Sequence, residues 1–229
     1  MTMKNLVVLT GAGMSAESGM ATFRDSGGLW DKYPVEKVAT PGGFAANPEL
    51  VLEFYNIRRE ELLNASPNAG HRLLAELEKR FHVSIITQNV DDLHEKAGST
   101  DVLHLHGELM KVQSTGDSSL VYELTPEKYR VNVGDTCEKG FQLRPFIVWF
   151  GEAVPKIEEA AEKVQSADIF VIIGTSLNVY PAAGLVHYVP AGAPVYLIDP
   201  NEVASPGNRS VIHLRKGASE GVKELSALI

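Results

Sequence analysis

Two histidines, His104 and His106, follow an apolar run and are separated by one residue. An imidazole that titrates near neutrality can act as a general base, and it is also a common metal ligand. Side chains two residues apart in a strand lie on the same face, so both rings are expected on one face. Three interpretations stay open on this spacing alone: a catalytic base, part of a metal site, or a structural histidine.

Amide and carboxylate side chains are concentrated in residues 87–94, directly after another apolar run. Gln88, Asn89 and Asp91 offer groups that hydrogen-bond a carboxamide or a ribose hydroxyl. Open α/β sheets bind their ligands beyond the carboxyl ends of the strands, which is where this cluster is expected. The alternative is that Asp91 only caps the helix that follows.

Glycines and small hydroxyl residues follow two further apolar runs. Residues 6–10 lead into Gly11-Ala12-Gly13-Met14-Ser15, and residues 169–173 lead into Gly174-Thr175-Ser176. Glycine lets a backbone approach a phosphate closely, which suggests a nucleotide site. Because Ala16 stands where the dinucleotide fingerprint has its third glycine, a tight turn that merely needs small residues is the alternative. A polar loop with Phe23, Arg24 and Trp30 is able to fold over a bound nucleotide.

The elements that must position these residues alternate along the chain. Short runs rich in Val and Ile predict strands at residues 6–9, 83–86, 102–105, 146–150, 169–173 and 195–198. Helical spacing of apolar residues predicts helices around residues 50–57, 73–77 and 222–228. The runs lack clean alternation, as strands buried on both faces do, so we expect an α/β fold with a parallel sheet.

Two stretches interrupt the alternation. Residues 25–77 contain helical patterns without a convincing strand, and residues 111–143 are polar and rich in turns. We expect both to leave the sheet as insertions and to form one smaller module within a single domain of residues 1–229. The larger part is then expected at about residues 1–24, 78–110 and 144–229.

Composition excludes several classes of protein. The 229 residues include 21 Lys and Arg against 29 Asp and Glu, a net charge of −8, so binding to nucleic acid or to an anionic membrane is not expected. A single cysteine, Cys137, excludes a disulfide framework. The apolar run at residues 6–9 is too short for a signal sequence or a membrane span. We expect a soluble, cytoplasmic, monomeric protein.

Five ordered motifs together resemble the sirtuins, the NAD-dependent protein lysine deacylases. The motifs are Gly11 to Gly19 with Phe23-Arg24, Thr87 to Asp91 with Leu93-His94, Leu105-His106-Gly107, Phe150-Gly151-Glu152, and Gly174-Thr175-Ser176. The resemblance runs from about residue 6 to residue 218. It implies a Rossmann-like part and a small module, with NAD and an acyl-lysine protein or peptide bound between them.

The resemblance also implies a role for each matching residue. His106 becomes the general base, and Asn89 and Asp91 act in catalysis and hold the nicotinamide end of NAD. The other residues that the resemblance places on NAD are Gly11, Ala12, Gly13, Ser15, Phe23, Arg24, Trp30, Gln88, Val90, Gly174, Thr175, Ser176, Asp199, Asn201 and Ala218. Val148, Phe150, Gly151 and Glu152 are expected to line the peptide groove. The products are nicotinamide, O-acyl-ADP-ribose and free lysine.

Tyr55 and Arg58 refine the expected substrate. In the sirtuin branch that removes succinyl, malonyl or glutaryl groups, a Tyr and an Arg three residues apart bind the carboxylate of the acyl group. A guanidinium suits that task because it can bond both carboxylate oxygens. The alternative is a solvated arginine on a charged helix face that also carries Arg59, Glu60 and Glu61.

The chain departs from the usual sirtuin pattern at three places: Ala21 replaces a proline common before the Phe-Arg pair, Asp199 stands where an asparagine is usual, and the zinc ligands are missing. Most sirtuins hold a structural zinc with two Cys-x-x-Cys pairs, whereas the corresponding interval here has only Cys137, so we expect no metal site. Apolar contacts of Val121, Tyr122, Leu124, Tyr129, Val131 and Phe141 are expected to hold the module instead. Two competing functions remain: an inactive or weakly active NAD- or ADP-ribose-binding protein, and a metal hydrolase that uses His104 and His106.

Overall fold

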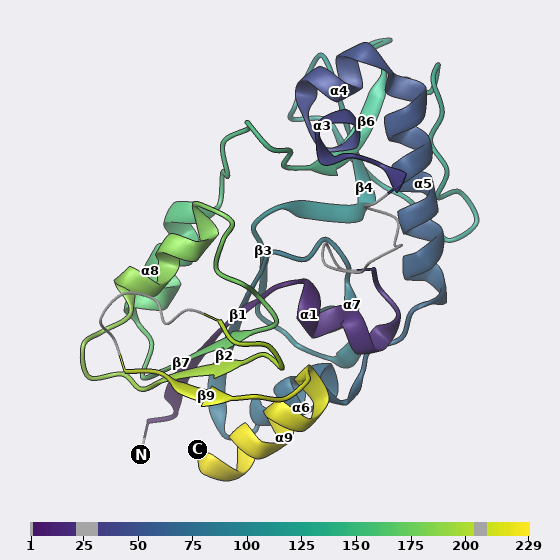
Figure 1. Ribbon diagram of the computed structural model, residues 1–229. Coiled ribbons are helices and arrows are strands. Elements are labelled where there is room, and N and C mark those ends of the chain that lie inside the picture. Colours follow the sequence, from purple (N-terminus) through teal and green to yellow (C-terminus); the bar gives the residue numbers. More distant parts are fainter. Residues whose placement is uncertain (1, 22–31, 204–209) are drawn as a thin grey trace. The chain divides into compact units, whose positions relative to one another are not determined.

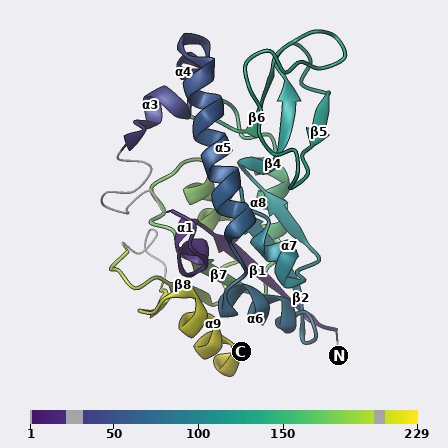
Figure 2. The same cartoon turned by 90° about the vertical axis from the view of Figure 1, so that its right-hand side faces the viewer.

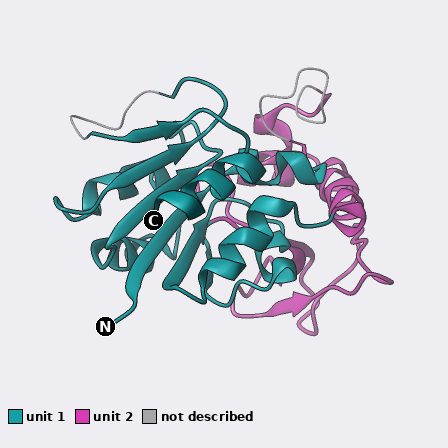
Figure 3. Ribbon diagram, turned by 90° about the horizontal axis from the view of Figure 1, so that it is seen from below, with its two compact units in different colours: residues 1–20, 66–105, 154–229 teal, residues 21–65, 106–153 magenta. Residues whose placement is uncertain are grey.

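The computed structural model describes residues 2–21, 32–203 and 210–229. The chain divides into two compact units (Figure 3), and it crosses between them several times. Unit 1 consists of Met1–Met20, Ser66–Leu105 and Val154–Ile229, and unit 2 of Ala21–Ala65 and His106–Ala153.

Unit 1 is built on a six-stranded parallel sheet with the order β3-β2-β1-β7-β8-β9 (Figure 1). Its strands are β1 (Lys4–Thr10), β2 (Phe81–Thr87), β3 (Val102–His104), β7 (Ile169–Ile173), β8 (Val195–Ile198) and β9 (Ile212–Leu214). The helical segments of this unit are α1 (Ala12–Ser15), η1 (Ala16–Ser18), α6 (Ala69–Leu77), α7 (Leu93–Ala97), α8 (Ile157–Gln165), η2 (Ala182–Tyr188) and α9 (Ala218–Leu228).

Both faces of this sheet are buried. Alternate residues of β1 divide between two apolar clusters: Leu6 and Val8 join α6 and α9, whereas Val7 and Leu9 join α8 and η2. Helices α6 and α9 lie side by side on one face and α8 lies on the other (Figure 1). Because each face needs apolar side chains, β1, β7 and β8 show no alternation of polar and apolar residues, whereas β2 begins with one, at His82 and Ser84. The predicted α/β class with a parallel sheet is therefore confirmed.

The local predictions for unit 1 are mostly confirmed. Five of the expected strands correspond to β1, β2, β3, β7 and β8, and the expected helices near residues 73–77 and 222–228 are α6 and α9. Strand β9 was not predicted, because its three residues include His213 and give too short an apolar run.

Unit 2 contains, within its described residues, a three-stranded antiparallel sheet and three helices. The sheet has the order β5-β4-β6, formed by β4 (Gly107–Ser114), β5 (Val121–Glu123) and β6 (Leu143–Ile147). The helices are α3 (Val35–Val38), α4 (Pro41–Ala46) and the long α5 (Pro48–Asn64), which runs beside β4 (Figure 2). The predicted strand at residues 146–150 is wrong: β6 begins and ends three residues earlier and pairs with β4, not with the parallel sheet.

The unit boundaries differ from those expected. Helix α6 belongs to unit 1, because Leu74 and Leu77 pack into the core under the parallel sheet. Residues 106–110 and 144–153 belong to unit 2, because β4 and β6 pair with each other. The chain therefore leaves unit 1 after His104 and Leu105, earlier than the sequence suggested.

Polar contacts to backbone, as well as apolar packing, hold unit 2 together. Asn56 donates to the carbonyl of Val131 at 3.0 Å and accepts from its N–H at 2.9 Å. The Nε of Arg59, a fully buried side chain, donates to the carbonyl of Leu109 at 2.7 Å. Such bonds tie α5 to two segments more than forty residues away, which fixes the module without thiolate ligands.

The expected apolar set of unit 2 is only partly correct. Leu52, Val112 and Val131 form a buried cluster of this unit, with Tyr122 and Leu124 packed against them. Val121 and Phe141 are 39% and 45% exposed and lie outside that cluster. Among the described residues, no helix is both long and apolar enough to cross a membrane.

Candidate functional site

The strand order of unit 1 reverses at β1, which lies between β2 and β7. Ligands of open α/β sheets bind at such a point, beyond the carboxyl ends of the strands. There the two predicted glycine turns meet: Gly11 N–H donates to the carbonyl of Ile173 at 3.0 Å, and Gly13 N–H donates to that of Gly174 at 2.9 Å. A Cβ on Gly13 would lie 2.7 Å from the Cα of Gly174. Close packing of the two turns therefore accounts for these glycines.

Ser15, Asn89 and Asp91 form a buried hydrogen-bonded group at this edge of the sheet. The Ser15 hydroxyl donates to Asp91 Oδ2 at 2.9 Å, and Asn89 Nδ2 donates to the same hydroxyl at 3.0 Å. Asp91 Oδ1 also accepts from the N–H of Leu93 at 3.2 Å, at the start of α7. The N-cap residue of α7 is Asp92, so the capping alternative holds only in that Asp91 accepts the first N–H of the helix. The Asp91 carboxylate also orients Ser15.

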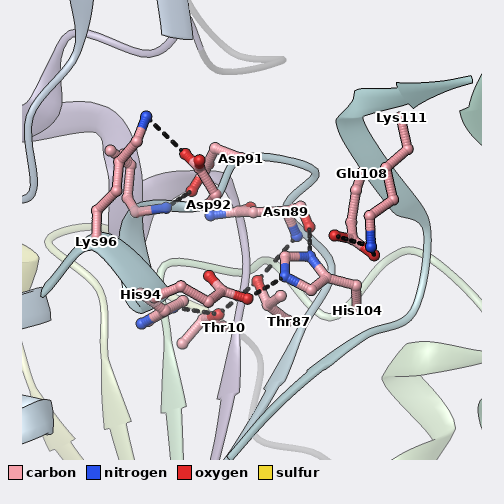
Figure 4. A network of polar contacts seen from close by, with 12 residues as sticks. Thr10, Thr87, Asn89, Asp91, Asp92, His94, Lys96, His104, Glu108 and Lys111 are labelled. Atoms are coloured by element: carbon pink, nitrogen blue, oxygen red, sulfur yellow. Dashed lines mark hydrogen bonds and ion pairs between the residues drawn. The ribbon is translucent and has the colours of Figure 1, made fainter. Parts of the chain in front are cut away.

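A second set of polar groups supports Asn89 (Figure 4), and the sequence did not predict their contacts. The Thr87 hydroxyl accepts from the N–H of Asn89 at 3.0 Å and from the Thr10 hydroxyl at 2.8 Å. His94 Nε2 lies 3.2 Å from the Thr10 hydroxyl. These side chains come from the last residues of β1 and β2 and from α7, so the parallel pairing of the two strands brings them together.

His104 and His106 have different surroundings. Strand β3 ends at His104, so the two rings do not share a strand face, and that expectation is wrong. His104 is buried, and its Nδ1 lies 3.2 Å from the carbonyl oxygen of Asn89 (Figure 4). Its Nε2 lies 2.7 Å from Glu95 Oε1. With both ring nitrogens engaged, His104 is a poor metal ligand, and the described residues contain no cluster of three potential metal ligands.

His106 is the first residue of its segment in unit 2 and is half-buried. Its carbonyl accepts from the N–H of Val148 at 2.9 Å. Gly107 follows with φ +85°, a conformation that side chains other than glycine rarely adopt. A Cβ there would lie 2.0 Å from the carbonyl oxygen of Phe146. Gly107 thus sets the backbone that carries His106.

The remaining predicted NAD residues of unit 1 divide into two groups. Gln88 Nε2 donates to the hydroxyl of Thr175 at 3.2 Å, which joins the turns after β2 and β7. Asp199 is buried at the end of β8, where Oδ1 accepts from the N–H of Asn201 at 2.9 Å. Ala218 is the buried first residue of α9. Ala12, Val90 and Ser176 are half-buried at the same strand ends, whereas Phe23, Arg24 and Trp30 lie outside the described residues.

Tyr55 and Arg58 are buried on α5, at 3% and 9% exposure. This contradicts the alternative of a solvated arginine. Burial raises the pKa of Tyr55 to about 12, although the nearby Arg58 cation opposes the shift. Burial also raises the pKa of Glu61, again opposed by Arg58. The phenol therefore stays protonated at neutral pH, with a cation beside it.

Residues 148–152 form a turn after β6, not a strand. Phe150 is 47% exposed, and Gly151 has φ +92° with no described atom within 4 Å of the point that a Cβ would occupy. Glu152 accepts from both terminal guanidinium nitrogens of Arg144, Nη1 and Nη2, at 2.7 and 3.0 Å, and from the N–H of Trp149 at 2.8 Å. Burial opposes ionisation of Glu152, but Arg144 holds its pKa below the ordinary value. Glu152 shapes this turn rather than presenting a free carboxylate.

The fold and the grouped residues define a nucleotide-binding α/β protein with an additional small module. A model of the Sir2 family matches residues 11–181, and the chain belongs to that family. A relative from Bacteroides thetaiotaomicron is 67% identical over 230 residues, covering 99% of this chain and 98% of the relative. One from Helicobacter pylori is 50% identical over 223 residues, covering 97% and 96%. Both are named NAD-dependent protein deacylase.

Solved structures agree with this assignment. A complex of a Sir2 homologue with NAD is 42% identical, with a TM-score of 0.88, and covers 98% of this chain and 89% of its own. A variant Sir2 homologue bound to ADP-ribose is also 42% identical, with a TM-score of 0.89 and coverage of 98% and 91%. In the present chain, hydroxyl, amide and carboxylate side chains gather at the switch point of the sheet, and this donor set fits the ribose hydroxyls and carboxamide of NAD.

Proposed function

We propose that this protein is an NAD-dependent protein lysine deacylase that removes succinyl and malonyl groups as well as acetyl groups. Membership of the Sir2 family and the polar group at the switch point support the NAD-dependent reaction. The single observation that carries the preference for acidic acyl groups is the buried pair of Tyr55 and Arg58.

Unit 1 supplies the groups proposed to bind and orient NAD. When bound, NAD supplies an activated ribose carbon and nicotinamide as the leaving group. Asn89 and Asp91 are proposed to hold the ribose and the carboxamide, and Ser15 links their side chains. Because all three are buried and bonded to one another, their orientation is set before the ligand arrives, which reduces the cost of ordering them on binding.

His106 is the proposed general base, which takes a proton from a ribose hydroxyl. An imidazole suits this step because it titrates close to neutral pH. His104 is buried, and its ring contacts the Asn89 carbonyl and Glu95, so we assign it to the support of Asn89.

The acyl carboxylate is proposed to be bound by Arg58 and Tyr55 together. A guanidinium bonds both oxygens of a carboxylate, and a protonated phenol donates one further hydrogen bond. A buried arginine favours an anionic ligand strongly, because its charge is weakly screened there. An acetyl group offers no carboxylate to either residue.

The test compares acetyl-, succinyl- and malonyl-lysine peptides of one sequence with NAD, with nicotinamide and O-acyl-ADP-ribose followed by mass spectrometry. Arg58→Met keeps an unbranched stem and should lower kcat/KM for the acidic peptides by at least about tenfold, while acetyl turnover changes far less. Arg130→Met is the matched control, because Arg130 is an exposed arginine of the same unit. Equal losses of kcat/KM on all three peptides would refute the preference for acidic acyl groups. They would not contradict the proposed deacylase activity.

The competing functions give different results in the same assay. An inactive NAD- or ADP-ribose-binding protein would release no nicotinamide with any peptide, and a metal hydrolase would not need NAD. The cytoplasmic location, the monomeric state and the lack of nucleic-acid and membrane partners stay predictions from the sequence. Size-exclusion chromatography with light scattering tests the monomer directly.

A further inference from the structure

Trp149 makes a hydrogen bond inside unit 2 that no motif indicated. Its indole Nε1–H donates to the hydroxyl oxygen of Tyr55 at 2.9 Å, and both side chains are 3% exposed. An indole N–H can only donate, so the Tyr55 oxygen must be the acceptor. The hydroxyl proton of Tyr55 stays available, and within the described part of the chain no group accepts it.

The Trp149 side chain and backbone are both held in place. The Arg144 guanidinium lies 3.6 Å from the centre of the indole ring, and Glu152 bonds that guanidinium through both carboxylate oxygens. Glu152 also accepts the backbone N–H of Trp149, and Phe44 packs against the ring at a centroid distance of 5.3 Å. The indole N–H therefore has a fixed direction, and Tyr55 receives it from that direction.

We propose that Trp149 is a positioning residue for acyl selectivity: its N–H occupies the acceptor side of the Tyr55 hydroxyl and directs the hydroxyl proton toward an acyl carboxylate. This inference rests on the proposed removal of succinyl and malonyl groups. A carboxylate only accepts hydrogen bonds, so a phenol forced to act as a donor matches it. A phenol hydroxyl that is free to rotate points its proton in other directions part of the time. Binding of the carboxylate would then have to fix the hydroxyl, at a cost in entropy.

The directing effect is confined to substrates with an acyl carboxylate. The methyl group of an acetyl substrate accepts no hydrogen bond, so the direction of the Tyr55 proton does not affect it. The Trp149 N–H is therefore expected to change the ratio of succinyl to acetyl turnover, and this effect is transmitted through the Tyr55 hydroxyl.

The experiment replaces Trp149 with Phe, which keeps an aromatic ring over Arg144 and removes the N–H. The ratio of kcat/KM for succinyl peptide to that for acetyl peptide should fall about threefold to tenfold, the usual effect of one neutral hydrogen bond. The loss should lie mainly in KM for the succinyl peptide, because binding of the carboxylate is weakened. The double variant Tyr55→Phe, Trp149→Phe should have the same ratio as Tyr55→Phe alone.

A second variant removes the effect of ring size. Replacement of Trp149 with 3-benzothienylalanine keeps the bicyclic shape and exchanges only the N–H for sulfur, so it reports on the hydrogen bond even if Trp149→Phe folds poorly. A fall in the ratio with this residue supports the proposal. An unchanged ratio, or equal losses on both peptides, overturns it and assigns Trp149 a packing role.

The controls separate this inference from the function on which it rests. If the unmodified protein shows no succinyl activity, both the proposed function and the inference fail. If Arg58→Met lowers succinyl turnover selectively while both Trp149 variants keep the ratio of the unmodified protein, the inference alone fails.

Discussion

His104 and Asn89 are joined by a contact from side chain to backbone: the Nδ1 of His104 lies 3.2 Å from the carbonyl oxygen of Asn89. A carbonyl only accepts, so the Nδ1 must carry a proton. The Nε2 lies 2.7 Å from Glu95 Oε1, which favours a proton there also. His104 thus bridges α7 to the backbone of the residue proposed to hold NAD.

His104→Ala should weaken NAD use, because it leaves the buried Asn89 carbonyl without this donor. The expected result is a rise in KM for NAD and a fall in kcat/KM of about threefold to tenfold, measured at saturating peptide. Glu95→Gln keeps an acceptor for the ring and should have a smaller effect in the same direction. His82→Ala, at an exposed position of β2, is the control. Wild-type NAD kinetics in His104→Ala would mean that the contact has no role in binding.

His106→Ala should abolish most deacylation. Loss of a general base costs about two orders of magnitude in kcat or more, while calorimetry should show NAD binding largely retained. His104 is not a suitable control for this experiment, since it contacts Asn89, so His82→Ala serves here as well. A fully active His106→Ala protein would require another base.

Asp91→Ala should reduce both stability and turnover. The carboxylate accepts from the Leu93 N–H and from Ser15, so its loss should cost about 1 kcal/mol of unfolding free energy and also disorder the Ser15 and Asn89 group. Thermal melting and NAD turnover measured on the same preparation test this. Lowered stability with unchanged kinetics would reduce Asp91 to a helix-capping residue.

The strands of unit 1 and the loops at their ends could be predicted from the sequence, because continuous Val and Ile runs are typical of strands buried on both faces. The strand predicted at residues 146–150 was misplaced, because an apolar run of five residues there continues from β6 through the turn that carries Trp149 and Phe150. The contacts of Asn56 with Val131 and of Trp149 with Tyr55 were not predicted. Such bonds join residues 75 and 94 positions apart, and no local pattern encodes a partner at that distance.

His71 and His94 predict how stability depends on pH. Their rings lie 4.8 Å apart and are fully buried, and burial lowers the pKa of His71 to about 4 and that of His94 well below its ordinary value. The unfolded chain takes up protons below about pH 6.5 that the folded protein does not. The free energy of unfolding should therefore be at its full value above about pH 6.5 and fall as the pH decreases, by up to about 1.4 kcal/mol per pH unit for each histidine.

Urea unfolding between about pH 7 and pH 5 measures this effect above the range in which ordinary carboxyl groups titrate. The double variant His71→Gln, His94→Gln should show a flatter dependence over that interval, whatever its absolute stability. His82→Gln should keep the slope of the unmodified protein. Equal slopes in the double variant and the unmodified protein would contradict the assignment of the effect to this buried pair.

Gly107→Ala separates backbone strain from steric overlap beside His106. Gly107 has φ +85°, and an added Cβ would lie 2.0 Å from the carbonyl oxygen of Phe146, an atom of the paired strand β6 that cannot turn away. Gly140, in the same unit, has φ +79° but no described atom within 4 Å of an added Cβ. Gly140→Ala should therefore cost only the strain of a positive φ, about 1 kcal/mol. Gly107→Ala should cost about 3 kcal/mol or more and should also lower deacylation, because relief of the overlap moves the backbone that carries His106.

Urea unfolding and turnover are measured for both variants. Equal losses of stability would show that β4 and β6 separate easily at this point, and that the glycine is required for its φ alone.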